Sequence, residues 1–177
     1  MATDLLDLYR QASDWTAEKV AGTTDLDAET PCDEWRVRDL LDHMLDTQRY
    51  FLGAALGEKQ PPPSPTPPHL STEDPAADFE QARSKVLAAY GQDGVIEKTG
   101  PALGIAFSDQ LLHGWDLARA TKQDATMPDG LAQAAYEFIH GRFTDDQRTG
   151  VFKPEIPVGD DATPQQRLLA YTGRDPA

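Results

Sequence analysis

Residues 102–121 read ALGIAFSDQLLHGWDLARAT, and this stretch decides the fold class. At about 100° per residue, its apolar side chains cover nearly the whole circumference of a helix. A helix that is apolar on almost every side is a buried one. The stretch therefore predicts a central helix with other helices packed around it.

Three other segments have the spacing of helices: about Asp4 to Val20, Val37 to Leu56, and Asp74 or Pro75 to Tyr90. Apolar residues recur in each at intervals of three and four. Strand patterns are almost absent from the chain. Four long helices predict an all-α fold, a four-helix bundle with its core at about residues 4–121.

A proline-rich segment follows the second of these helices. Residues 61–68 read PPPSPTPP, with six prolines in eight positions. Proline has no amide hydrogen and a fixed φ, so the segment predicts extended polyproline backbone rather than helix or central strand. We expect a semi-rigid surface connector; the alternative is a ligand for a proline-binding domain.

Shorter elements are expected after the bundle, in residues about 122–177. In chain order they are a helix near Gly130 to His140 capped by Asp129, an extended piece at Glu155 to Val158, and a last helix that Thr163 opens and Gly173 ends. The last helix begins Thr-Pro-Gln-Gln, which has the form of a capping box with proline at the first helical position. We expect residues 1–177 to form one domain with this part as a C-terminal extension.

The composition excludes several classes of partner. The chain has 30 acidic and 16 basic residues, a net charge of -14, which argues against nucleic acid. No segment approaches the roughly 20 consecutive apolar residues of a membrane span, and the N-terminus does not resemble a signal peptide. A single cysteine, Cys32, fits a reducing compartment. We expect a cytoplasmic protein with a small-molecule substrate, and a homodimer is possible.

The buried helix at 102–121 carries a polar stripe. Asp109, His113 and Asp116 share one face, because positions i, i+4 and i+7 lie close together on a helix. A buried carboxylate beside an imidazole is costly unless it is paired, hydrogen-bonded or bound to a metal. The helix at 37–56 has a matching pattern, with Asp39 four residues before His43 and Asp46 three residues after it.

Ligands from these two helices could hold a metal ion. His43, Asp109 and His113 would supply two nitrogen atoms and one oxygen atom, a set that suits Zn²⁺, Ni²⁺ or Fe²⁺ and leaves positions open. Two alternatives remain at this point. The polar stripe could be a hydrogen-bonded His–Asp pair in the core, or a coincidence on acidic helices.

Three more carboxylates are expected beside the metal, where they would orient the imidazoles without binding the ion. They are Asp116, Asp39 and Asp46. Asp116 could instead pair with Arg119 or Arg10. Asp39 could simply favour the helix dipole in the first turn. No residue is assigned a catalytic role.

Other polar residues are weaker candidates. His69 in the proline-rich segment and His140 near a helix end are expected to be solvated surface imidazoles. Cys32 is expected to be a small packed residue, although a thiol before a helix start could have a lowered pKa. Trp115 is close enough to His113 in sequence to form the wall of a pocket.

Two motifs carry a family resemblance. Residues 30–44, TPCDEWRVRDLLDHM, and residues 113–121, HGWDLARAT, resemble the actinobacterial metal-binding proteins of the DinB-like superfamily. The N-terminal domain of mycothiol-dependent maleylpyruvate isomerase belongs to the same superfamily. The tail from Val158 to Pro176 is similar to that of the actinobacterial subgroup, so the resemblance covers most of the chain.

The resemblance implies a four-helix bundle that holds one divalent ion, Zn²⁺ or Ni²⁺, through His43, Asp109 and His113. It also implies an enzyme, a transferase or isomerase, that uses a low-molecular-weight thiol such as mycothiol. The alternatives are a metal-dependent hydrolase and a non-catalytic metal-binding protein. Two departures stand out: the isomerase has a glutamate where this chain has Asp109, and it has a separate C-terminal domain for which this chain is too short.

Overall fold

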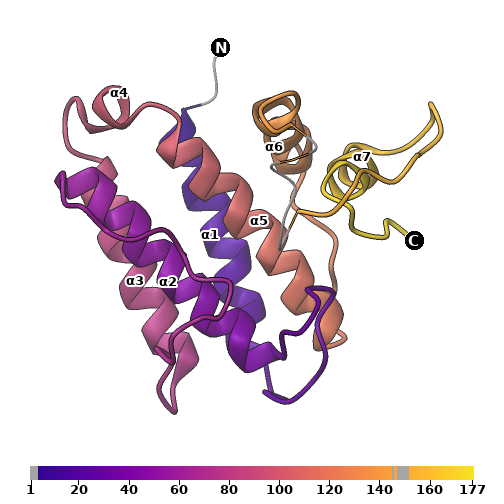
Figure 1. Cartoon of the computed structure of the whole chain (residues 1–177), viewed down its shortest axis with the longest axis horizontal. Helices are drawn as coiled ribbons and strands as arrows, with labels where there is room; N and C mark the ends of the chain where they lie inside the picture. The colour runs from indigo at the N-terminus through magenta and orange to yellow at the C-terminus, as the bar shows by residue number, and fades with distance from the viewer. Residues whose placement is uncertain (1–3, 145, 147–151) are drawn as a thin grey trace.

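The computed structural model describes residues 4–144, 146 and 152–177 (Figure 1). Helices are the only regular elements in these residues, so the predicted all-α class is confirmed. The helices are α1 (Leu5–Ala21), α2 (Val37–Leu56), α3 (Pro75–Tyr90), α4 (Val95–Thr99), α5 (Ala102–Ala120), α6 (Leu131–Ile139) and α7 (Pro164–Tyr171).

The four long helices form the predicted bundle. Helix α1 packs on α5 and α3, and α2 packs on the same two helices from the other side (Figure 1). Helix α5 contributes more buried apolar residues to the core than any other helix, as its apolar circumference predicts. Its backbone lies very close to α1, because a Cβ atom at Gly114 would stand only 2.4 Å from Thr16 Oγ1.

Local sequence signals explain where the helices begin and end. The Asp4 carboxylate accepts a hydrogen bond from Leu6 N at the start of α1. Helix α2 ends at Gly57, whose φ of 74° is a left-handed conformation that favours glycine. The capping box predicted at Thr163 is present, with Gln166 as its partner.

Two local features differ from expectation. Between Gly91 and Gly100, where the glycines predict only a break before the next helix, the chain forms the one-turn helix α4. Helix α6 is not capped by Asp129, because Gly130 occupies the cap position with a φ of 80° and no side-chain cap is formed.

The segment Glu155–Val158, which is expected to be extended, has no regular secondary structure. Its backbone bonds to α7, through Ile156 N and Ala170 O at 2.9 Å. Helix α7 packs on α6, and α6 packs on α5, so the C-terminal part lies against one side of the bundle (Figure 1). None of the described helices is long and apolar enough to cross a bilayer.

Candidate metal centre

Two helices that are far apart in sequence bring the three predicted ligands together. His113 Nε2 on α5 lies 3.4 Å from Asp109 Oδ1, one turn earlier on the same helix. The ring of His43, from α2, stands edge-on to the ring of His113 with centroids 4.8 Å apart. One potential ligand atom from each of the three residues lies within 4.8 Å of the others.

His43 is the unusual member of this cluster. It is only 7% exposed, and neither of its ring nitrogens has a hydrogen-bond partner in the described structure. The indole of Trp35 covers it at a ring-centroid distance of 4.5 Å. Burial lowers the pKa of His43 to about 4, so the ring is neutral at physiological pH and its lone pair is available. A buried polar atom without a partner is costly and rare, and a metal would supply the missing bond.

His113 is anchored from its other side by Asp116. Asp116 Oδ2 lies 3.0 Å from His113 Nδ1, and the carboxylate also accepts two hydrogen bonds from Arg174, at 2.8 and 2.7 Å. Asp116 therefore pairs with a residue of the C-terminal tail, not with Arg119 or Arg10.

The hydrogen bond to Asp116 decides which nitrogen of His113 is available to bind a metal ion. Burial alone would raise the pKa of Asp116, but the charge of Arg174 outweighs it and keeps the group ionised. An ionised carboxylate can only accept, so Nδ1 of His113 carries the proton that it receives. Nε2 then faces Asp109 and His43. The same carboxylate–imidazole arrangement orients histidine ligands in known metal sites.

Without a metal, His113 would carry a second proton on Nε2. Burial alone would lower the pKa of His113, but the carboxylate of Asp109, with a further contribution from Asp116, raises it well above its usual value. Burial likewise opposes ionisation of Asp109, yet the His113 charge keeps the pKa of that carboxyl below its usual range. A proton on Nε2 therefore occupies the place that a metal ion could take.

Cys32 offers a second possible ligand group, with His113 and Asp116. Its Sγ lies 3.3 Å from Asp116 Oδ2, so it is a hydrogen-bonded thiol as well as a small packed residue. Burial raises the pKa of the Cys32 thiol, contrary to the lowered value considered for it. Both oxygens of Asp116 are already bound by the fixed cation of Arg174, which would repel a metal ion. The set of His43, Asp109 and His113 is therefore the better site.

The other two carboxylates make their hydrogen bonds outside the imidazole cluster. Asp39 Oδ2 accepts a hydrogen bond from Arg36 N at the start of α2. Asp46 pairs with Arg49 at 2.6 Å and accepts a hydrogen bond from the backbone of the proline-rich segment. Neither carboxylate is hydrogen-bonded to a ring of the cluster, so their predicted orienting role has no contact to support it.

The proline-rich segment is more than a connector. The carbonyl of Pro65 accepts a hydrogen bond from Trp35 Nε1 at 3.1 Å, and Ser64 N donates to Asp46. The segment thus holds the indole that covers His43. The tryptophan beside the imidazoles is Trp35, whereas Trp115 lies in the apolar core.

The two weaker histidines lie outside the cluster. His69 is exposed, and its Nδ1 lies 3.0 Å from the buried carboxylate of Asp42. His140 is exposed between the rings of Tyr136 and Tyr171. Both positions agree with the expected surface imidazoles, although His69 has a partner.

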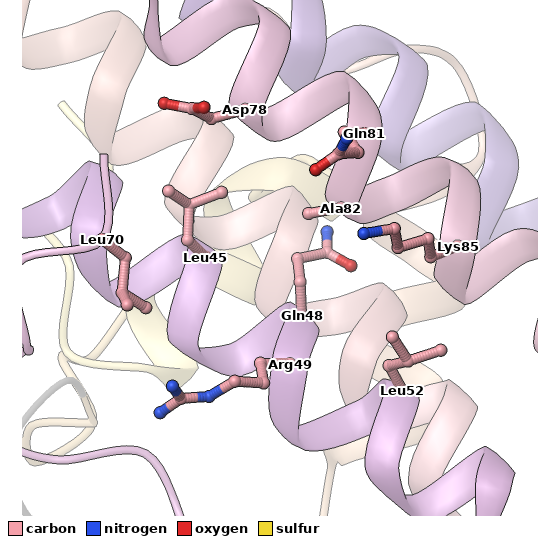
Figure 2. A pocket seen from close by; sticks show the side chains of 9 residues that line it. All are labelled: Leu45, Gln48, Arg49, Leu52, Leu70, Asp78, Gln81, Ala82 and Lys85. Carbon is pink, nitrogen blue, oxygen red and sulfur yellow. The ribbon is translucent and has the colours of Figure 1, made fainter. Parts of the chain in front are cut away.

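Two of the cavities beside α2 and α5 differ in character. A groove of about 230 Å³ separates α2 from α3, where Gln48 and Lys85 project from facing helices (Figure 2). It contains none of the candidate ligands. A smaller space of about 30 Å³ is lined by Asp109, His113 and apolar side chains that include Phe152. It has room for one or two water molecules.

The sequence did not single out Arg174, Cys32 or Trp35 for this centre. Arg174 lies 58 residues after Asp116, and no spacing rule connects the two positions. The only available signal was physical: a carboxylate on a helix that is apolar on all sides needs a cation.

Comparisons with known proteins identify the family to which the fold corresponds. Residues 9–120 match the family described as the mycothiol maleylpyruvate isomerase N-terminal domain. Two relatives from Mycobacterium tuberculosis, the uncharacterized proteins MT0763 of strain CDC 1551 / Oshkosh and Rv0738 of strain H37Rv, are each 27% identical to the chain over 181 residues. Each alignment covers 97% of this chain and 98% of the relative. No solved structure matches the chain.

Proposed function

We propose that this chain, which belongs to the mycothiol maleylpyruvate isomerase N-terminal domain family, binds one divalent metal ion through His43, Asp109 and His113. Zn²⁺ and Ni²⁺ suit two imidazoles and one carboxylate. The observation that carries the proposal is His43, a buried neutral imidazole with two unpartnered nitrogens beside two other potential ligands.

We further propose that the centre acts on a low-molecular-weight thiol, in agreement with the family's description. A divalent ion in this place would bind the thiol as a thiolate and so provide a nucleophile at neutral pH. Charge balance supports an anionic ligand. A dication added to the two carboxylates of Asp109 and Asp116 and the guanidinium of Arg174 leaves one net positive charge, which a thiolate neutralises.

The protein's own groups would prepare the centre. Asp116 holds His113 by Nδ1, Trp35 covers His43, and the proline-rich segment holds Trp35. The negative charges of Asp109 and Asp116 favour a cation at the centre. A hydrolase is the second candidate, because the space beside Asp109 and His113 is of water size.

Metal content is the first test. Protein purified without a histidine tag should contain one Zn²⁺ or Ni²⁺ per chain, and a chelator should lower its melting temperature, because an ion bound only by the folded state stabilises it. Absence of metal together with an unchanged melt would contradict the proposal. The cobalt-substituted protein then distinguishes the two candidate activities. If the centre binds thiols, adding a small thiol should produce a thiolate-to-metal absorption band. If the protein is a hydrolase without thiol affinity, no such band should appear.

The pKa values predict how metal affinity depends on pH. Between about pH 5 and 7, His43 is already neutral, since its pKa is about 4, whereas His113 carries an extra proton. Binding should therefore release one proton, from His113, and the affinity should rise about tenfold for each pH unit. Calorimetry in two buffers with different ionisation enthalpies measures this number. Release of two protons near pH 5 would show that His43 is not a neutral ligand.

A further inference from the structure

A buried ion pair between Asp116 and Arg174 adjoins the candidate centre. The side chain of Asp116 is 0% exposed and that of Arg174 is 5% exposed. Nε and Nη2 of the guanidinium donate to the two oxygens of the carboxylate, which fixes the plane of the carboxylate. Arg174 lies after α7, outside the part of the chain that matches the family.

The fold of the tail sets the position of Arg174. Gly173 has a φ of 76°, and a Cβ atom there would meet Lys153 Cβ at 2.4 Å. Arg174 N donates to Leu169 O at 2.9 Å, and Lys153 N donates to Thr172 O at 3.1 Å. The turn at Gly173 therefore packs the tail closely against the segment at Lys153 and brings Arg174 to Asp116 on α5.

We infer that Arg174 is a positioning residue of the metal centre, which acts through Asp116 on His113. The inference rests on the proposed function. Asp116 Oδ2 accepts from both Arg174 Nη2 and His113 Nδ1, so one oxygen joins the tail to the imidazole. By holding this oxygen, Arg174 keeps Nε2 of His113 turned toward the other two ligands. Partners of this kind typically change metal affinity by about 10–100-fold.

A purely structural role is the alternative. In that case the ion pair only ties the tail to α5, and its loss lowers stability while folded molecules keep their full metal affinity. Metal affinity of the folded protein therefore distinguishes the two roles.

The experiment measures the dissociation constants of Zn²⁺ and Co²⁺ in the full chain with Arg174→Gln and Arg174→Lys. We expect Arg174→Gln to weaken binding by about 10–100-fold. Arg174→Lys should recover part of the loss, because an ammonium keeps the charge but cannot donate to both oxygens in one plane. Arg167→Gln is the matched control, since Arg167 is on α7 and, among the described residues, its guanidinium donates to the exposed carbonyl of Asp160. It should stay within about twofold of the wild type.

The ¹⁵N signals of the His113 imidazole supply a second measurement. In the zinc-bound wild type they should show a proton on Nδ1 and the metal on Nε2. In Arg174→Gln we expect a mixture of this state with others in which Nδ1 and Nε2 are occupied differently. If Arg174→Gln does not fold, the double variant Asp116→Asn/Arg174→Gln removes both charges, which is far less costly than removing one. It should be folded and still bind the ions about tenfold more weakly.

Wild-type affinity in a folded Arg174→Gln or in the double variant would overturn the inference and leave the proposed function in place. Failure of the wild type to bind either ion would overturn the proposed function itself.

Discussion

Replacing His43 with leucine is expected to abolish metal binding and to leave the metal-free protein at least as stable as the wild type. In the metal-free state both ring nitrogens of His43 are buried without partners, and each such atom costs about 1–3 kcal/mol. Leucine is similar in size and has no polar atom. The free energy of unfolding of the metal-free variant should therefore be at least that of the wild type, and up to about 1–2 kcal/mol higher.

Denaturant unfolding with and without Zn²⁺ tests this expectation. The wild type should gain stability from the ion and His43→Leu should gain none. A marked loss of stability in the metal-free variant would mean that His43 is needed for packing, and retained metal would mean that it is not a ligand.

The same substitution at His113 should have the opposite effect on stability. His113→Leu removes the ring that lies between Asp109 and Asp116 and leaves both carboxylates with one partner fewer. We expect loss of the metal together with a decrease of about 2–4 kcal/mol in the free energy of unfolding, even without metal.

His140→Leu is the matched control for both variants, because His140 is exposed and its ring lies beside the rings of Tyr136 and Tyr171, outside the cluster. It should change the free energy of unfolding by less than about 0.5 kcal/mol and leave metal binding intact. If His113→Leu kept the metal and His140→Leu lost it, the assignment of the site to α5 would be wrong.

The fold could be predicted from the sequence because its signals are local and agree with one another. The apolar circumference of residues 102–121 predicts a buried helix, and α5 is the helix that contributes most to the core. The capping box at Thr163 predicted the start of the last helix, which is present. The exceptions were also local: a one-turn helix between glycines and a cap formed by Gly130 leave almost no pattern.

The candidate ligands could be predicted for a similar reason. The four-residue spacing of Asp109 and His113 places both on one face of α5, and only packing was needed to bring His43 to them. The sequence left open whether His113 and Asp116 form a hydrogen-bonded pair or part of a metal site. The contacts show that one imidazole can do both, since Nδ1 of His113 is bonded and Nε2 faces the cluster.

The supporting residues could not be predicted, because their contacts are set by tertiary packing alone. Arg174 reaches Asp116 only after α7 and the tail have packed beside α6. Trp35 is held by a proline carbonyl 30 residues away, and a segment without amide hydrogens gives no hint that its carbonyls are used. Cys32 looked isolated because its partner lies 84 residues later.

X-ray absorption at the metal edge of the zinc-loaded protein, without added thiol, tests the central claim most directly. The proposed site predicts scattering from two imidazole rings with Zn–N distances of about 2.0–2.1 Å, further oxygen ligands, and no sulfur. Sulfur scattering at about 2.3 Å would contradict it, because it would place the ion at Cys32 and Asp116 on the other side of His113. Absence of imidazole scattering would contradict it equally.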